Sequence, residues 1–204
     1  HVVFDAGNGV AGPTVKAVYD DLPVEYNELY MEPDSSFPNH DPNPMEPENT
    51  ADLREQVKAS HADAGFAWDG DADRFFLIDD QGSFVAPDVL YAFLADRYLA
   101  GNPGPIVKSA LCGQIVDDVA QRNNVPLGVS RVGHGFVKRA YDNHNAVLAG
   151  EHSGHYYFDE THGCDDGIAA SLLTYAVLSD LDTPVSEALE EYRKYVKSGE
   201  QNFE

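Results

Sequence analysis

The most informative stretch of this chain is FAWDGDADRFFLIDD at residues 66–80. It places three carboxylates, Asp69, Asp71 and Asp73, at alternate positions with one small residue in each gap. The runs on both sides are apolar and rich in aromatic residues, which is typical of buried strands. We therefore predict a strand, a tight acidic loop and a second strand.

The acidic loop predicts a metal site. Three carboxylates so close together repel one another unless a cation neutralises them. A small set of carboxylate oxygens suits Mg²⁺, which keeps water or substrate phosphate in its other positions. A solvated acidic turn, which can arise by chance in an acidic chain, remains the alternative. A calcium EF-hand is disfavoured, because Arg74 stands where its glycine is needed, Asp80 stands where its glutamate is needed, and the flanks are strand-like.

Arg74 follows the three carboxylates directly and allows two interpretations. Its guanidinium can neutralise the acidic cluster, or it can hold a phosphate oxygen next to a bound metal. A metal and an arginine that converge on one point stabilise phosphoryl transfer electrostatically.

Composition narrows the classes of partner. The chain has 204 residues and a net charge of −22, from 35 acidic and 13 basic residues, which disfavours binding to nucleic acid or anionic membranes. No apolar run reaches membrane-spanning length, and the two cysteines lack metal-site spacing, which is compatible with a reducing cytoplasm. Such an acidic composition with few lysines also suggests a halophilic source, where the cytoplasm is rich in salt.

Strand and helix patterns alternate along the rest of the chain. The patterns predict strands at 2–5, 23–30, 106–107 and 126–129. They predict helices at 13–21, 49–60, 87–100 and 114–123, and a last helix that opens at GCDDG (163–167) and ends at about 179. This order predicts an α/β fold of two successive mixed, largely parallel α/β domains, at residues 1–83 and 84–204. The chain also starts directly on a strand, which suggests a fragment of something longer.

Residues 31–48 contain five prolines among polar residues. A loop this long in a compact domain usually has a functional purpose. His40 lies within it, and we interpret it as a surface histidine.

Two glycine-rich segments form a second candidate site. VGHGFVK (132–138) and GEHSGH (150–155) each follow a predicted strand, at the edge where open α/β sheets bind ligands. Glutamate, serine and histidine together can accept from and donate to sugar hydroxyls. His134 could equally be a simple turn residue, and Asp165 with Asp166 is interpreted as an N-cap pair for the following helix.

Motifs along the whole chain resemble one family, the α-D-phosphohexomutases of the phosphomannomutase/phosphoglucomutase superfamily. The segments that carry the resemblance are VVFDAGNGVAG (2–12), FPNHDPNPMEPEN (37–49), DGDADR (69–74), VGHGFVK (132–138), GEHSGH (150–155), DDGIAASLL (165–173) and SGEQNFE (198–204). The resemblance implies a fold and a set of roles for particular residues. Those implied roles are Mg²⁺ binding by Asp69, Asp71 and Asp73, proximity to the transferred phosphoryl group for Arg74, sugar recognition by Glu151 and Ser153, and lining of the same cleft by His134 and His155.

The resemblance also implies an activity. Members of the family are cytoplasmic, Mg²⁺-dependent isomerases of carbohydrate metabolism, which move a phosphoryl group between the C1 and C6 oxygens of a hexose phosphate through a bisphosphorylated intermediate. Their lysine near residues 108–112 has no clear match, because Lys108 is displaced from its place.

Two parts of the family's enzyme have no match. Its phosphorylated serine lies in a TASHNP-like loop of a first domain, and KASH at residues 58–61 is only superficially similar because it ends a predicted helix. A fourth domain, which anchors the distal phosphate, is also unmatched. The chain is therefore expected to correspond to domains two and three, and to be inactive without the missing domains.

Two alternatives remain open. The chain could be a non-catalytic module that binds metal or sugar phosphate, or it could derive from a phosphoglucosamine mutase. A serine loop upstream of His1 would decide for a mutase, and a panel of sugar phosphates would separate the members of the family.

Overall fold

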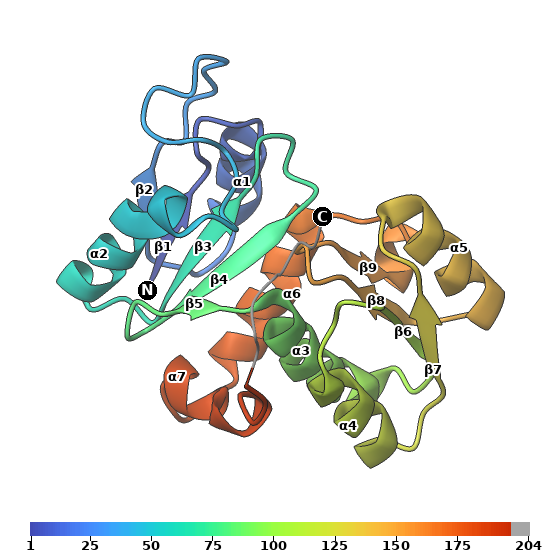
Figure 1. Ribbon diagram of the computed structural model, residues 1–204. Coiled ribbons are helices and arrows are strands. Elements are labelled where there is room, and N and C mark those ends of the chain that lie inside the picture. Colours follow the sequence, from blue (N-terminus) through green and yellow to red (C-terminus); the bar gives the residue numbers. More distant parts are fainter. Residues whose placement is uncertain (197–204) are drawn as a thin grey trace.

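The computed structural model describes residues 1–196, which form two mixed β-sheets with helices around and between them (Figure 1). The first sheet has the strand order β2-β1-β3-β4-β5. Its strands are β1 (Val2–Asp5), β2 (Tyr26–Leu29), β3 (Ala64–Trp68), β4 (Phe75–Asp79) and β5 (Phe84–Val85). Strand β1 pairs in parallel with β2 and β3, whereas β4 is antiparallel to both β3 and β5.

The second sheet repeats this plan with the order β7-β6-β8-β9. Its strands are β6 (Ile106–Ser109), β7 (Leu127–Ser130), β8 (Leu148–Gly150) and β9 (Tyr156–Phe158). Strand β6 is parallel to β7 and β8, and β9 runs antiparallel to β8. Each sheet therefore has three parallel strands followed by an antiparallel one, and β5 adds a fifth strand to the first sheet, as the predicted mixed and largely parallel α/β class requires.

Seven α-helices and three short 3₁₀ turns occur within residues 1–196. The α-helices are α1 (Ala11–Tyr19), α2 (Ala51–Ser60), α3 (Pro87–Gly101), α4 (Gln114–Arg122), α5 (His134–His144), α6 (Gly167–Ser179) and α7 (Val185–Ala188). The 3₁₀ turns are η1 (Pro47–Thr50), η2 (Asp159–Thr161) and η3 (Glu190–Tyr192). Most predicted elements are present within a few residues of their expected bounds.

One continuous apolar core joins the two sheets. Helices α3 and α6 lie between the sheets in Figure 1, and residues of both helices and both sheets belong to the same buried cluster. The outer faces are covered separately, by α2 on the first sheet and by α5 on the second. Most residues of α3 are buried all round, as a helix enclosed between two layers must be.

Helix α5 was not predicted. Its sequence begins with His134 and Gly135 after Gly133, and glycine disfavours helix by about 1 kcal/mol relative to alanine. The helix forms because Val137 and Tyr141, one turn apart, pack on the second sheet with Val107 and Ala149. Tertiary packing therefore outweighs the local glycine cost.

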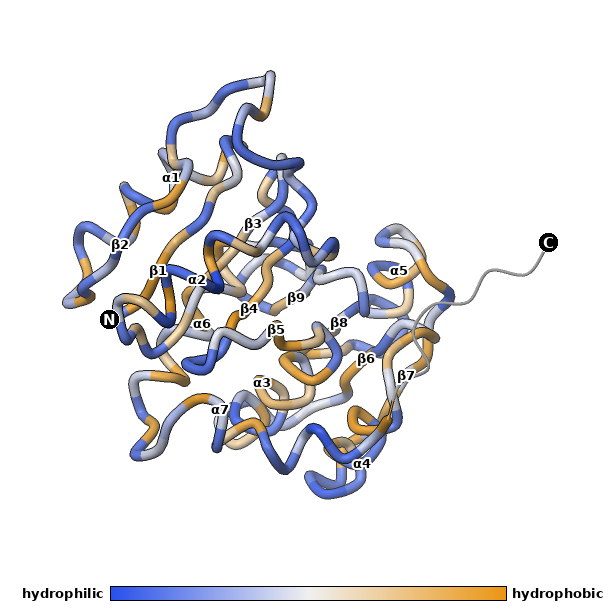
Figure 2. The backbone as a smooth tube through the Cα atoms, turned by 60° about the vertical axis from the view of Figure 1, so that its left-hand side comes forward, coloured by the Kyte–Doolittle hydropathy of each residue, from blue (hydrophilic) through white to orange (hydrophobic). Residues whose placement is uncertain are grey.

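The hydropathy of the chain follows this arrangement. Figure 2 shows hydrophobic residues along β1 and β4, whereas the long loop that rises above the first sheet is mostly hydrophilic. None of the helices within residues 1–196 is long and apolar enough to cross a membrane. Both cysteines are free, with Cys112 buried and Cys164 exposed.

Two sequence-based statements remain predictions. The proposed division into residues 1–83 and 84–204 falls just before β5, which pairs with the first sheet. The resemblance of SGEQNFE at residues 198–204 lies outside the described residues.

Candidate functional site

The acidic loop connects β3 to β4 as a tight turn at the edge of the first sheet. One oxygen from each of Asp69, Asp71 and Asp73 lies within 4.8 Å of the others, although the three differ in burial. Asp69 is buried, Asp71 exposed and Asp73 half-buried. Among residues 1–196, Asp73 Oδ1 is a buried oxygen without a hydrogen-bond partner, and it is free to coordinate a cation. The carboxylates thus fit a hard divalent cation.

Arg74 is turned toward Asp69. Its Nε donates to Asp69 Oδ2 at 2.6 Å, and its backbone N–H donates to Asp69 Oδ1 at 3.1 Å. Burial raises the pKa of Asp69 to about 6, while the hydrogen bonds from Arg74 pull it down. In this arrangement the arginine neutralises the buried carboxylate, and its Nη1 reaches Asn43 Oδ1 at 3.4 Å.

The proline-rich loop packs against the acidic loop. A Cβ added to Gly70 would lie 3.3 Å from the ring of Pro42, and Asn43 contacts Arg74 as described. The interpretation of His40 as a surface histidine is wrong. Its Nε2 lies 3.2 Å from a carboxylate oxygen of the buried Asp5, and only 10% of its side chain is exposed. This pair fastens the loop to the end of β1.

The GEHSGH segment forms the turn between β8 and β9. Glu151 is buried, with Oε1 accepting from the Tyr157 hydroxyl at 2.6 Å and Oε2 accepting from the Gly133 N–H at 3.2 Å. Ser153 Oγ and His155 Nδ1 are 2.8 Å apart and form a hydrogen bond, whose donor depends on the tautomer of His155. Three residues predicted to line the sugar site, Glu151, Ser153 and His155, therefore lie in a single turn.

Backbone pairing joins this turn to the acidic loop. Arg74 and His155 form an antiparallel bridge, and the Phe75 N–H donates to the Gly154 carbonyl at 3.0 Å. As a result, His155 Nε2 lies 3.4 Å from Asp73 Oδ2. Residues that are about eighty positions apart in the sequence thus meet at one point.

Asp165 is a site residue that the sequence did not reveal. Asp166 alone caps α6, because its Oδ1 accepts from the N–H groups of Ile168 and Ala169, both at 2.9 Å. Asp165 Oδ2 instead lies 4.0 Å from His155 Nε2 and 3.6 Å from His134 Nδ1. The interpretation of both aspartates as an N-cap pair is therefore half right.

His134 stands at the first position of α5, with 72% of its side chain exposed. Its ring centroid is 6.4 Å from that of His155, so the structure brings the two histidines to the same place. All eight predicted site residues therefore belong to two adjoining loops and the start of α5.

Lys108 is held by residues at the start of α4. It is buried, donates to the carbonyls of Cys112 and Gly113, and forms an ion pair with Asp117. KASH at residues 58–61 is likewise a structural helix end, where Ser60 Oγ donates to the Gln56 carbonyl at 2.8 Å.

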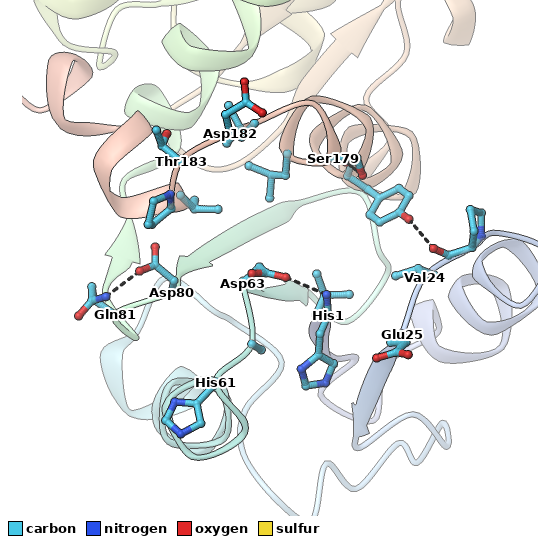
Figure 3. A pocket seen from close by; sticks show the side chains of 18 residues that line it. His1, Val24, Glu25, His61, Asp63, Asp80, Gln81, Ser179, Asp182 and Thr183 are labelled. Carbon is cyan, nitrogen blue, oxygen red and sulfur yellow. Dashed lines mark hydrogen bonds and ion pairs between the residues drawn. The ribbon is translucent and has the colours of Figure 1, made fainter.

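A cavity of about 1040 Å³ lies elsewhere, beside residues that precede the strands of the first sheet (Figure 3). His1, whose terminal amine donates to Asp63 at 2.8 Å, and Asp80, which accepts from Gln81, line it. Ligands of open α/β sheets bind beyond the carboxyl ends of the strands, which is the opposite edge. None of the predicted site residues lines this cavity.

Comparison with known proteins gives consistent matches. Residues 1–82 match the family described as phosphoglucomutase/phosphomannomutase, alpha/beta/alpha domain II, and residues 86–195 match domain III of the same family. A protein named phosphohexose mutases from Xanthomonas campestris is 38% identical over 205 residues, covering 99% of this chain and 46% of its own length. A phosphomannomutase of Escherichia coli is 35% identical over 209 residues, covering 98% and 46%.

Solved structures agree with these matches. A phosphoglucomutase/phosphomannomutase family protein from Burkholderia thailandensis superposes with a TM-score of 0.85 at 36% identity, covering 92% of this chain and 41% of that one. An N-acetylphosphoglucosamine mutase from Aspergillus fumigatus shares the fold at 17% identity and a TM-score of 0.64, covering 92% and 45%. The chain spans about half the length of the curated relatives that it matches. It belongs to the phosphoglucomutase/phosphomannomutase family.

Proposed function

We propose that this chain supplies the metal-binding and sugar-reading parts of a phosphohexomutase. The whole enzyme would move a phosphoryl group between the C1 and C6 oxygens of a hexose phosphate through a bisphosphorylated intermediate. The main support is the pairing of the acidic loop with the GEHSGH turn, through the Arg74–His155 bridge and the Phe75–Gly154 hydrogen bond. This pairing would fix the proposed metal ligands and hydroxyl-binding groups relative to one another, as a transfer between two oxygens of one sugar requires.

Asp69, Asp71 and Asp73 would hold Mg²⁺. Bound there, the ion would neutralise charge on the oxygens of the transferring phosphoryl group. The support from this chain is the convergence of three carboxylate oxygens and the unsatisfied Asp73 Oδ1.

Arg74 would serve the same phosphoryl group. Its Nε is engaged by Asp69, which fixes the guanidinium plane beside the metal ligands. The terminal nitrogens of an arginine so fixed can donate to a phosphate oxygen in a defined direction.

Glu151, Ser153, His134 and His155 would contact the sugar. A carboxylate accepts from hydroxyl groups, whereas serine and histidine can donate or accept. Because His155 also lies 3.4 Å from Asp73, it would stand where the sugar and the phosphoryl group meet.

The phosphoserine that carries the transferred group in this family would lie outside these 204 residues, together with the domain that anchors the distal phosphate. We therefore expect weak binding and no turnover from this chain alone, since metal and arginine stabilise a phosphoryl group but cannot carry it. The partners would be the remaining domains of the same enzyme and a hexose phosphate, in the cytoplasm.

NMR titration with glucose 1-phosphate and mannose 1-phosphate tests this proposal. Amide signals of residues 150–155 should shift at high ligand concentration, and no product should form. Ser153→Ala should weaken binding roughly threefold to tenfold, the loss of one hydrogen bond. The control Ser179→Ala removes an exposed hydroxyl of α6 and should change nothing. Turnover by the purified chain, or ligand shifts confined to other residues, would contradict the proposal.

A further inference from the structure

Glu151 is a buried carboxylate that links two loops. It stands directly after β8, and its two oxygens accept from different segments of the chain, the Tyr157 hydroxyl in β9 and the Gly133 N–H before α5. A buried carboxylate without such donors is costly, so both bonds matter to its position. Glu151 therefore couples the GEHSGH turn to the start of α5.

The Gly133 turn depends on this bond for its place. Gly133 has a φ of 114°, in the region that favours glycine, and its carbonyl accepts from the first turn of α5. Its N–H donates to Glu151 Oε2 and so ties the turn to the second sheet. His134 is the next residue, and its ring is mostly exposed, with Asp165 at 3.6 Å and the His155 ring beside it.

Tyr157 is the donor that fixes Glu151. Its ring is buried among the side chains that pack beneath α5, including Val107, Val137 and Tyr141, so the hydroxyl has a fixed position. Burial and the hydrogen bond to Glu151 raise the pKa of Tyr157 far above its usual range. The hydroxyl is therefore protonated at neutral pH and donates to Glu151.

We propose that Tyr157 is a positioning residue of the sugar site. Its hydroxyl holds the Glu151 carboxylate in the orientation that anchors the Gly133 N–H, and this sets both Glu151 and His134 for the ligand. Tyr157 does not touch the ligand itself. That the positioned groups bind a sugar rests on the proposed function, whereas the anchoring of Gly133 does not.

The variant Tyr157→Phe removes only the hydroxyl and leaves the packing of the ring. A matched control exists in the same small core, because the Tyr141 hydroxyl also donates to a carboxylate, Asp159 Oδ1, at 2.9 Å. Tyr141→Phe therefore removes a phenol–carboxylate bond of the same kind, partly buried, away from Glu151. Comparing the two variants separates the positioning of Glu151 from a general loss of stability. Thermal unfolding of both variants measures that loss.

Amide hydrogen exchange of Gly133, followed by NMR, is the first readout. In Tyr157→Phe we expect Gly133 to exchange at least about tenfold faster, because its acceptor is no longer held in place. In Tyr141→Phe the Gly133 rate should stay within about twofold of the wild-type rate, since Glu151 keeps both donors. Unchanged Gly133 exchange in Tyr157→Phe, or equal acceleration in both variants, would overturn the proposal.

A second variant keeps the test decisive if Tyr157→Phe does not fold. Glu151→Gln has nearly the same shape, but its amide presents one oxygen instead of two and cannot accept both bonds in the same geometry. It should accelerate Gly133 exchange as well. Protection of Gly133 equal to wild type in Glu151→Gln would also overturn the proposal.

The ligand readout is titration of each protein with glucose 1-phosphate. Tyr157→Phe should bind about tenfold more weakly than Tyr141→Phe. If the wild-type chain binds the sugar phosphate and the two variants bind equally, the positioning role for the ligand fails. If the wild-type chain does not bind at all, the proposed function fails, and Gly133 exchange alone decides the role of Tyr157.

Discussion

At the scale of single residues, the three aspartates of the acidic loop differ in burial and in how far their charge is neutralised. Asp69 is buried and neutralised by Arg74, whereas Asp71 remains exposed. Asp73 keeps one oxygen without a hydrogen bond within the described part of the chain. The negative charge of the cluster is therefore only partly neutralised by Arg74, which leaves a place for a cation.

The first prediction concerns this cation. Calorimetric titration with Mg²⁺ should show one site, and Asp71→Asn should weaken it by tenfold or more, about 1.4 kcal/mol or above, because a charged ligand is lost. Asp21→Asn, at an exposed position after α1, removes the same charge elsewhere and serves as the control. Equal binding by Asp71→Asn and wild type would argue against the site.

His40 gives a prediction about pH. The hydrogen bond with Asp5 raises the pKa of His40 above its ordinary value of 6.5. The folded state then holds the proton more tightly, so this pair stabilises the protein fully below the unfolded pKa and loses that effect as pH rises through the folded pKa. His40→Gln should cost about 1–2 kcal/mol at pH 5.5 and clearly less at pH 9.

Urea denaturation at both pH values measures this difference. His144→Gln, at an exposed position of α5, is the control and should show little change at either pH. A cost of His40→Gln that is the same at both pH values would mean that the ion pair does not contribute.

At the scale of elements, the start of α6 closes against the acidic loop. The Gly167 N–H donates to the Ala72 carbonyl at 3.1 Å, and the Gly167 carbonyl accepts from Trp68 Nε1 at 3.1 Å. A Cβ at Gly167 would lie 2.6 Å from the Ala72 oxygen and 2.7 Å from the Arg74 oxygen. Only glycine permits so close an approach of helix and loop.

Gly167→Ala should therefore push α6 away from the loop. We expect a loss of about 1–3 kcal/mol in the free energy of unfolding, as for overpacking of a core, together with weaker Mg²⁺ binding. Trp68 is the single tryptophan of the chain, so its fluorescence should report the altered contact.

The control for this prediction is Gly101→Ala at the end of α3, where an added Cβ meets no atom within 4 Å. Alanine there should be neutral or stabilising by up to about 1 kcal/mol, because it favours helix. Equal effects of the two substitutions would show that the contact of α6 with the loop is not tight.

At the scale of the whole molecule, the net charge of −22 is the feature that most affects stability. Many of the cations already form ion pairs with neighbouring carboxylates, for example Arg122 with Asp96 and Glu191, and Arg193 with Asp79. The remaining acidic groups repel one another, and this repulsion disfavours the compact state.

The melting temperature should therefore rise as KCl increases from low to molar concentration. Salt shortens the Debye length from about 30 Å at 0.01 M to about 3 Å at 1 M, so the repulsion between surface carboxylates is screened. Differential scanning calorimetry measures the trend, and the uncharged osmolyte sucrose at matched osmolality should not reproduce its low-salt part. A melting temperature that is flat or falls with KCl would contradict adaptation to salt.

The sequence by itself determined the local structure and the chemistry of the loops. Alternating apolar runs, prolines and glycines placed most strands and helices, since these signals depend on near neighbours. The three aspartates of the acidic loop and the residues of GEHSGH are each close in sequence, so their mutual proximity also followed from it. The order of strands and helices further predicted the mixed α/β class.

Which of these local units meet depends on contacts between distant parts of the chain. The contacts of His155 with Asp73, of His40 with Asp5 and of Tyr157 with Gly133 through Glu151 depend on chain pairing across loops and sheets. Asp165 looked like a second capping residue, yet the bridge between Tyr157 and Asp165 turns it toward the histidines. Helix α5 forms despite its glycine because its apolar side chains pack on the second sheet. Long-range contacts select among conformations that near neighbours leave almost equal in energy, so the sequence pattern alone does not reveal them.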